Sequence, residues 1–98
     1  MTEMKESLTL KIITVDRQIE IRDCDSVRLN IADDKNGKFS GSYGIKKGHA
    51  RAVFSLSAGT VTAYKKDELV FSAETSDGFG MVEDDTVSLT VDSIKESI

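Results

Sequence analysis

The sequence is short of cysteine, histidine and proline, and each shortage narrows what the protein can be. Its 98 residues include one cysteine, Cys24, one histidine, His49, and no proline. A single cysteine cannot form an internal disulfide, which favours a reducing compartment. One cysteine and one histidine cannot supply the four ligands of a structural zinc site. We therefore expect no disulfide, no bound metal and no cofactor.

Long apolar runs and an excess of basic residues are also missing. No run is long enough for a transmembrane helix, and residues 1–6 are too polar for a secretory signal. The formal net charge is −4. The pairs Lys46-Lys47 and Lys65-Lys66 lack interleaved aromatic residues, which favours solvated loops over a nucleic-acid surface. We expect a protein that neither binds nucleic acid nor inserts into a membrane.

What the sequence does contain is an alternation of apolar and polar residues. Hydrophobic residues make up 39% of the chain and charged residues 31%, as in a single globular domain. A period of two places each apolar set on one face of a strand. No segment before residue 93 shows the helical period of 3.6. The alternating apolar positions are 8, 10 and 12; 19 and 21; 27, 29 and 31; 52, 54 and 56; 61 and 63; 69, 71 and 73; and 87, 89 and 91.

Turn-forming residues separate these segments. Asn36-Gly37 is a strong hairpin signal, because both central residues of a type I′ turn need positive φ. The other predicted turns lie at residues 15–17, 57–59, 65–67 and 84–85, and Gly59 shapes one of them. Short strands at close spacing predict an all-β fold, either an antiparallel sandwich or a barrel.

The last residues give a different signal. Ser93-Ile-Lys-Glu96 has the S-x-x-E form of a capping box, which marks the start of a helix. Too few residues follow for a helix that is stable alone. The sequence therefore predicts a β domain over residues 1–92, followed at residues 93–98 by a helix stub or, equally, by a frayed tail.

The glycine-rich segment at residues 41–50 fits none of the usual phosphate-binding patterns. A Walker loop needs Lys-Ser or Lys-Thr after its second glycine, whereas His49 follows Gly48 here. The spacing of Gly41, Gly44 and Gly48 also fails the dinucleotide fingerprint. Residues 33–37 resemble the start of a calcium loop but lack its first ligand and its glutamate, so a turn is the better interpretation.

No catalytic group can be assembled from the remaining candidates. His49 and Cys24 are the only possible base and nucleophile, and the sequence does not bring them together. Cys24 reads as a small, partly buried residue, and His49 as a structural or contact residue. Asp84-Asp85 lies in a predicted turn, where solvation explains it. We expect a protein that is not an enzyme.

The glycine-rich segment does resemble one family. Gly41-Ser-Tyr-Gly44-Ile-Lys-Lys-Gly48-His49-Ala50 resembles the pattern G-x-x-G-I-x-P-G-H-A of the epsilon subunit of F-type rotary ATP synthases. Four further segments resemble family patterns in the same order, and together the matches span residues 7–92. They are residues 10–14 (L-x-V-V-T), 25–29 (V-x-S-V-x-L-P), 56–59 (the L-x-P-G hairpin) and 77–92 (G-G-F-V-E-V to V-T-V-L-A-D), the last containing the turn glycine Gly78.

This resemblance implies an antiparallel β-sandwich of about ten short strands. It implies a non-catalytic rotor subunit of the central stalk, coupling the gamma subunit to the ring of membrane c subunits. Tyr43, Gly44, Ile45, Gly48 and His49 are then the expected ring contacts, with Ile45 equally a candidate for the core. The location implied is peripheral, at the cytoplasmic face of the membrane.

Several features depart from the family pattern. Lys47 and Arg51 replace two prolines, so this segment is expected to be less rigid and more basic. Asp77 replaces the first glycine of the G-G-F turn. The family's C-terminal helical hairpin would begin at the Ser93–Glu96 signal, so its inhibitory role is not carried over. These departures leave open an alternative, a free-standing β-sandwich binding module that has diverged from the synthase.

Overall fold

A computed structural model describes residues 7–32 and 39–96, and over these residues the chain forms only strands and turns. The all-β prediction is confirmed. The described residues contain no helix long and apolar enough to cross a membrane. The strands are β1 (Leu8–Ile13), β2 (Gln18–Cys24), β3 (Ser26–Ala32), β4 (Phe39–Lys46), β5 (Ala52–Leu56), β6 (Gly59–Lys65), β7 (Glu68–Thr75), β8 (Gly78–Glu83), β9 (Thr86–Val91) and β10 (Ile94–Glu96).

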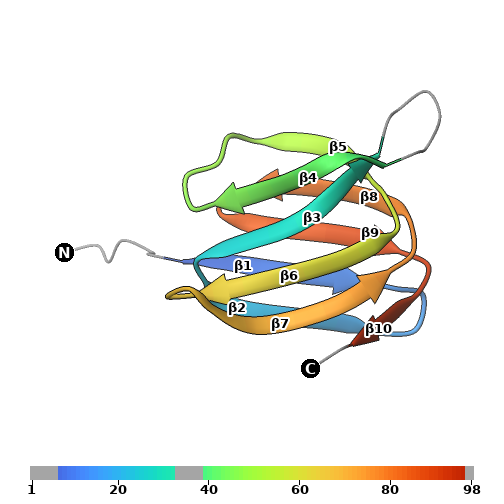
Figure 1. Ribbon diagram of the computed structural model, residues 1–98, viewed down its shortest axis with the longest axis horizontal. Helices are drawn as coiled ribbons and strands as arrows, with labels where there is room; N and C mark the ends of the chain where they lie inside the picture. Colours follow the sequence, from blue (N-terminus) through green and yellow to red (C-terminus); the bar gives the residue numbers. More distant parts are fainter. Residues whose placement is uncertain (1–6, 33–38, 97–98) are drawn as a thin grey trace.

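The strands form one hydrogen-bonded path that folds over into two layers (Figure 1). The front layer in Figure 1 has the order β10-β7-β6-β3-β4, and the back layer has the order β5-β8-β9-β1-β2. A single pair, Ile31 with Leu56, joins β3 of the front layer to β5 of the back layer. The result is the predicted sandwich, closed along this seam.

Most neighbouring strands are antiparallel, but β1 and β9 run parallel. This pair brings the first strand beside the ninth, with Leu10 opposite Val87 and Ile12 opposite Leu89. Parallel neighbours cannot be joined by a tight turn, so such a pair joins segments far apart in sequence. The contact closes the back layer around residues from both ends of the chain.

The two layers share one hydrophobic core. Along the strands, every second residue tends to face inward and to be buried, as the alternation predicted. Burying a Val, Leu or Ile side chain contributes about 1.5–3 kcal/mol, so this core supplies the main stabilisation. The largest fully buried side chains are Leu8, Leu10, Ile12, Cys24, Val27, Leu29, Ile45, Leu56, Val61, Val82, Val87 and Leu89.

Two of the predicted hairpins use acidic and basic residues in place of glycine. Lys66 and Asp67 join β6 to β7, and both have positive φ, of 51° and 66°. Asp84 and Asp85 join β8 to β9 with φ of 51° and 58°. Positive φ at both central residues is typical of type I′ turns, and aspartate tolerates this region. The predicted Asn36-Gly37 turn, including Gly37, lies outside the described residues.

The chain turns at residues 57–59 as predicted, but the hairpin that the resemblance suggested at residues 56–59 is wrong. The strands β5 and β6 on either side of it are not paired with each other, because they lie in different layers. The segment is a corner, held by a hydrogen bond from the Ser57 amide to the Asn30 carbonyl oxygen at 2.9 Å. A turn signal in the sequence reports a change of direction but not the strand that the chain meets afterwards.

Over the described residues, neither the helix stub nor the frayed tail expected from Ser93 onward is found. Residues 94–96 form β10, which pairs with β7 so that Ile94 lies opposite Thr75. The amide of Ser93 donates to the Ser76 hydroxyl at 3.2 Å, and Glu96 pairs with Arg17 at 3.5 Å. The exposed edge of β7 offers backbone hydrogen bonds, and these outweigh a weak local capping signal.

In β7, the apolar residues change from one face of the strand to the other partway along it. Leu69 was expected to point inward with Phe71 and Ala73, but its side chain is 43% exposed. The register between β6 and β7 shifts at Ala63/Tyr64, where Phe71 pairs with Ala63 and Leu69 with Tyr64. An extra residue at such a bulge reverses the facing of the residues beyond it. The bulge thus places Leu69 on the surface.

Candidate functional site

The segment expected to contact the ring is a strand for most of its length. Strand β4 continues to Lys46, so the first part of the glycine-rich segment is a strand. Because side chains alternate along a strand, the predicted contact residues divide between two faces. Tyr43 and Ile45 point toward the core, opposite Leu29 and Val27 of β3.

Ile45 belongs to the core. Its side chain is 0% exposed and is among the largest fully buried side chains of the domain. The prediction that Ile45 makes a surface contact is therefore wrong, and the core alternative is confirmed. Its neighbour Gly44 is exposed on the outer face, where a Cβ would meet no other atom within 4 Å.

A tight turn follows β4 and carries the chain to the back layer. The His49 amide donates to the Lys46 carbonyl oxygen at 3.1 Å, and Gly48 has a φ of +83°. Positive φ at the third residue is the mark of a type II turn, which explains the glycine. The Gly48 amide also donates to the Asp85 carboxylate at 2.7 Å. The turn is thereby tied to the β8–β9 hairpin.

His49 is held by both ring nitrogens. Nδ1 lies 2.7 Å from the Ala50 carbonyl oxygen, which can only accept, so this nitrogen carries the proton. Nε2 lies 2.5 Å from the Tyr43 hydroxyl and accepts from it. The two rings meet edge to face with centroids 5.4 Å apart, and Phe54 packs on Tyr43 at 5.9 Å. His49 thus anchors the turn to the inner aromatic residues.

The contacts described for Cys24 are separate from those of His49, Tyr43 and Phe54. The side chain is 0% exposed, and its thiol donates to the Leu8 carbonyl oxygen at 3.5 Å. Burial raises the pKa of the Cys24 thiol, because desolvation disfavours the thiolate. The described hydrogen bonds of Cys24 and His49 do not join the two residues. Cys24 and His49 therefore do not form a thiol–imidazole pair among the described residues.

Two glycines named from the sequence occupy crowded backbone positions. Gly59 begins β6 with φ of +152°, and a Cβ there would collide with the Asn30 side chain. A Cβ on Gly78, at the start of β8, would collide with the carbonyl oxygen of Thr90. Both residues allow close approach of the chain at layer corners, as turn-shaping glycines do.

An exposed apolar surface lies on the outer face of the back layer, and sequence reasoning missed it. Val53 of β5 is 74% exposed and stands opposite Met81 of β8, which is 37% exposed. Phe79 of β8, opposite Ser55, is 67% exposed. The sequence did contain a signal for this surface. Val53 is apolar, although it lies between Ala52 and Phe54, where the alternation calls for a polar residue. We refer to Val53, Phe79 and Met81 as the apolar patch.

One family model matches nearly the whole chain. The match is to the family described as ATP synthase, Delta/Epsilon chain, beta-sandwich domain, over residues 7–97. The chain belongs to this family of β-sandwich domains. A search of curated protein sequences finds no match.

Solved structures share the fold at low sequence identity. A chain of the Euglena gracilis mitochondrial ATP synthase, solved as OSCP/F1/c-ring, matches with a TM-score of 0.73 and 17% identity. That match covers 97% of the present chain and 56% of the Euglena chain. A chain of the Tetrahymena thermophila mitochondrial ATP synthase central stalk and c-ring matches with a TM-score of 0.68 and 12% identity, covering 95% and 68%. The present chain spans about half the length of the Euglena chain.

Proposed function

We propose that this protein is a non-catalytic rotor subunit of the central stalk of a rotary ATP synthase. It would couple the gamma subunit to the ring of membrane c subunits and hold no cofactor. The observation that carries the proposal is the match to the delta/epsilon sandwich family over residues 7–97. The similar structures, which belong to an F1/c-ring assembly and to a central stalk with its c-ring, support it.

The fold suits a part that transmits torque. A rotor subunit must hold two partners in fixed register while the assembly turns. Two layers packed on one core resist bending, because protein interiors are close-packed and transmit strain. The aromatic contacts and the Gly48–Asp85 hydrogen bond extend this stiffness to the turn at residues 46–49. No catalytic step is required of any residue.

We propose that the apolar patch is the surface that contacts the gamma subunit. Two of its three side chains, Val53 and Phe79, are exposed by more than half. Grouped apolar residues on an outer sheet face mark protein contacts, and aromatic residues anchor such interfaces. The remaining surface named from the sequence, Gly44, Gly48 and His49, would face the polar loops of the ring. Tyr43, on the core side of this surface, would hold the His49 ring in place through its hydroxyl group.

The two missing prolines are compatible with this role. Lys47 stands at the second position of the type II turn, where proline is favoured but not required. The turn is formed without it. Arg51 is largely exposed and lies 3.7 Å from Glu83 of β8. A subunit attached in this way would be peripheral to the membrane, at its cytoplasmic face.

The test is assembly with the cognate gamma subunit. The two chains, co-expressed, should co-purify at equal stoichiometry. Phe79→Ser should weaken gamma binding by about tenfold or more, since truncating an aromatic anchor costs above about 1–2 kcal/mol. Val15→Ser is the matched control, because Val15 is 93% exposed in the β1–β2 turn and lies outside the patch.

Two results would contradict the assignment. A failure to co-purify would favour the free-standing binding module instead. A complex that forms but ignores Phe79→Ser would keep the rotor role and remove the apolar patch as its gamma contact.

A further inference from the structure

The outer face of the front layer carries a polar groove that extends beyond the surface assigned to the ring. Its larger part has a volume of about 820 Å³, and a smaller part of about 320 Å³ adjoins it. Both parts are lined by Ser26, Arg28 and Lys46. We refer to the two parts together as the basic groove. The larger part is also lined by Asp25, Tyr64, Lys66 and Asp67, and the smaller part by Gly44, Lys47, Gly48 and His49.

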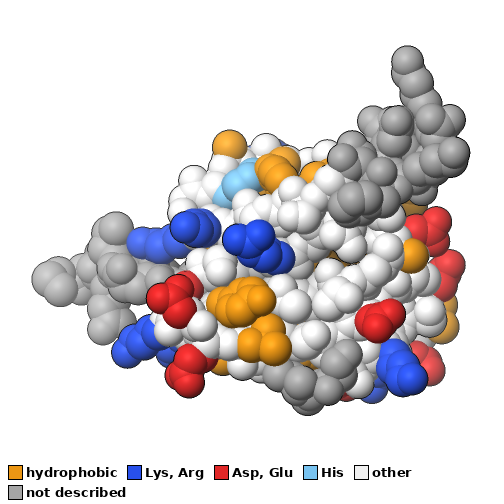
Figure 2. All heavy atoms as spheres, viewed as in Figure 1, with side chains coloured by type: hydrophobic (Ala, Val, Ile, Leu, Met, Phe, Trp, Pro, Cys, Tyr) orange, Lys and Arg blue, Asp and Glu red, His pale blue; other side chains and the backbone are white. Residues whose placement is uncertain are grey.

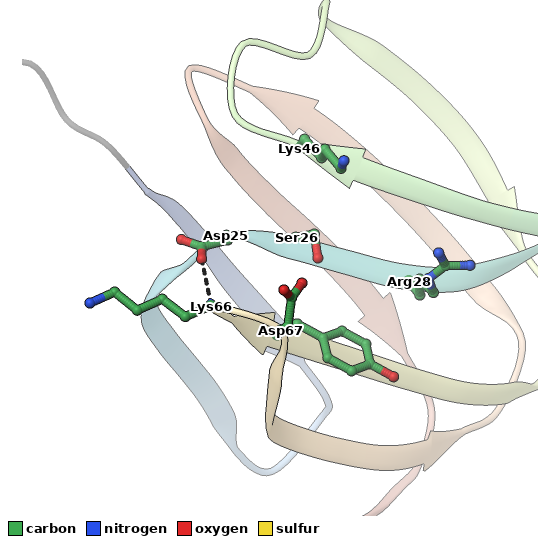
Figure 3. Close-up of a pocket in the computed structure, with 7 residues that line it drawn as sticks. Asp25, Ser26, Arg28, Lys46, Lys66 and Asp67 are labelled. Atoms are coloured by element: carbon green, nitrogen blue, oxygen red, sulfur yellow. Dashed lines mark hydrogen bonds between the residues drawn. The ribbon is translucent and has the colours of Figure 1, made fainter.

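Strand register explains why these side chains meet. Ser26 of β3 stands opposite Lys46 of β4 and Tyr64 of β6, so all three share the outer face. Arg28 stands opposite Gly44, where no side chain fills the space. Figure 3 shows Ser26 between Lys46 and Asp67, with Arg28 further along the same strand. The missing side chain of Gly44 leaves the hollow beside the guanidinium group.

The cations of this groove lack acidic partners within the described part of the chain. Other basic side chains form ion pairs, as Arg17 does with Glu96 and Lys65 with Asp23. No such pair involves Arg28, Lys46 or Lys47 among residues 7–32 and 39–96. Figure 2 shows Lys and Arg side chains near the single histidine on this face.

Carboxylates border the groove at both ends, since Asp25 and Asp67 line the larger part and Asp85 accepts a hydrogen bond from the Gly48 amide beside the smaller part. The smaller part has none among its lining residues. In the larger part, Asp25 accepts a hydrogen bond from the Lys66 amide at 2.6 Å. Asp67 is exposed in the β6–β7 turn. The smaller part is therefore lined by three cations, Arg28, Lys46 and Lys47, although the whole chain carries a net charge of −4.

We propose that the basic groove binds a phosphate-bearing ligand. A guanidinium offers parallel N–H donors that match phosphate oxygens, and lysine adds a mobile positive charge. The Ser26 hydroxyl at the groove floor can donate a further hydrogen bond. Three neighbouring cations favour a phosphate, which carries up to two charges, over a single carboxylate. The phosphate comes either from a free polyphosphate or from an anionic lipid headgroup.

This proposal can be tested separately from the rotor assignment. The two share Gly44, Gly48 and His49, but Arg28 and Lys46 belong only to the basic groove. Variants of Arg28 and Lys46 therefore test the phosphate proposal. Gamma binding, tested at Phe79 on the other layer, remains a separate measurement.

The first experiment titrates the whole chain with inorganic pyrophosphate by calorimetry at low salt. Binding should be saturable, and Arg28→Gln and Lys46→Gln should each weaken it about tenfold, as expected for a charged hydrogen bond. Lys95→Gln is the matched control, because Lys95 is an exposed lysine of β10 outside the groove. Gly44→Val should also weaken binding, because it fills the hollow beside Arg28.

The second experiment distinguishes the source of the phosphate. The chain is sedimented with vesicles of phosphatidylglycerol in phosphatidylcholine and with vesicles of phosphatidylcholine alone. Binding to the anionic vesicles without pyrophosphate binding identifies a headgroup, and pyrophosphate binding identifies a free phosphate. Absence of both overturns the proposal, as does binding that Arg28→Gln and Lys46→Gln reduce no more than Lys95→Gln.

Discussion

The outer faces of the two layers differ more than their inner faces do. Both inner faces bury branched aliphatic residues in one core, as Leu29 of the front layer and Leu89 of the back layer show. Outside, the back layer exposes Val53 and Phe79, while the front layer exposes Arg28 and its cationic neighbours. The two outer faces therefore differ in chemistry, although both layers are built from strands of the same kind.

This difference shows where the sequence is free to vary. An inward residue must fill the core, and its replacement is felt by the whole domain. An outward residue contacts water in the isolated chain and costs little to change. The sandwich therefore carries two surfaces of different chemistry without a change of fold. The following experiments test how independent the two layers are.

The largest effect is expected from the shared core. Leu29→Ala in the front layer and Leu89→Ala in the back layer should each destabilise the domain by about 2–5 kcal/mol. Both side chains are almost fully buried, at 1% and 0% exposure. Urea unfolding followed by circular dichroism measures the loss. If either variant unfolds in two separate transitions, the layers do not share one cooperative core.

A smaller effect should distinguish glycines of the two layers. Gly78→Ala in the back layer places a Cβ against the Thr90 carbonyl oxygen and should cost about 1–3 kcal/mol. Gly44→Ala in the front layer meets open space and should stabilise by about 0.4–1 kcal/mol, by restricting the unfolded chain. Thermal unfolding of the two variants measures both. Equal effects would show that the back layer is no more tightly closed than the front layer.

The smallest effect concerns an ion pair that joins the layers at the surface. Asp23 lies in β2 of the back layer, and Lys65 ends β6 of the front layer. A hydrogen bond from Lys65, with its charge, lowers the pKa of Asp23, and the Asp23 carboxylate raises the pKa of Lys65. The Asp23 contribution is present above the ordinary aspartate pKa of about 3.9 and is lost as pH falls through the lowered value.

The Lys65 contribution behaves in the opposite sense. It is complete below the ordinary lysine pKa of about 10.4 and is lost as pH rises through the raised value. Asp23→Asn keeps a residue that tolerates the positive φ of 67° at this position. Its melting temperature should fall slightly below that of the native chain at neutral pH. The difference should vanish in acid and shrink with salt, and a difference that persists in acid would contradict the pairing.

Much of the fold was predictable because it depends on local periodicity. Leu8, Leu10 and Ile12 alternate along β1 and all lie in the core, as predicted. The turn at Asp84-Asp85 was also found, since acidic residues there tolerate positive φ. The prediction failed where pairing is decided at a distance. Ile94 joins β7 in a strand, although the local capping signal at Ser93 favoured a helix.

The candidate site was predictable only in part. The resemblance selected residues 43–49 as one contact surface, but β4 turns Tyr43 and Ile45 toward the core. The basic groove could not be found from spacing, because Arg28 and Lys46 stand on different strands and meet through register. The three residues of the apolar patch come from two strands for the same reason. Registers of this kind depend on which strands pair, and no short pattern records that.

The sequence alone established that this protein is a β domain with period-two strands joined by turns at polar or glycine residues. It did so because the two-residue repeat and the φ of a turn are properties of neighbouring residues. The three-dimensional fold was needed to see which strands share a layer, which residues of β4 are buried, and where exposed apolar and basic side chains gather. Those outcomes depend on pairing between distant segments and on burial in a common core, and neighbouring residues alone do not fix them.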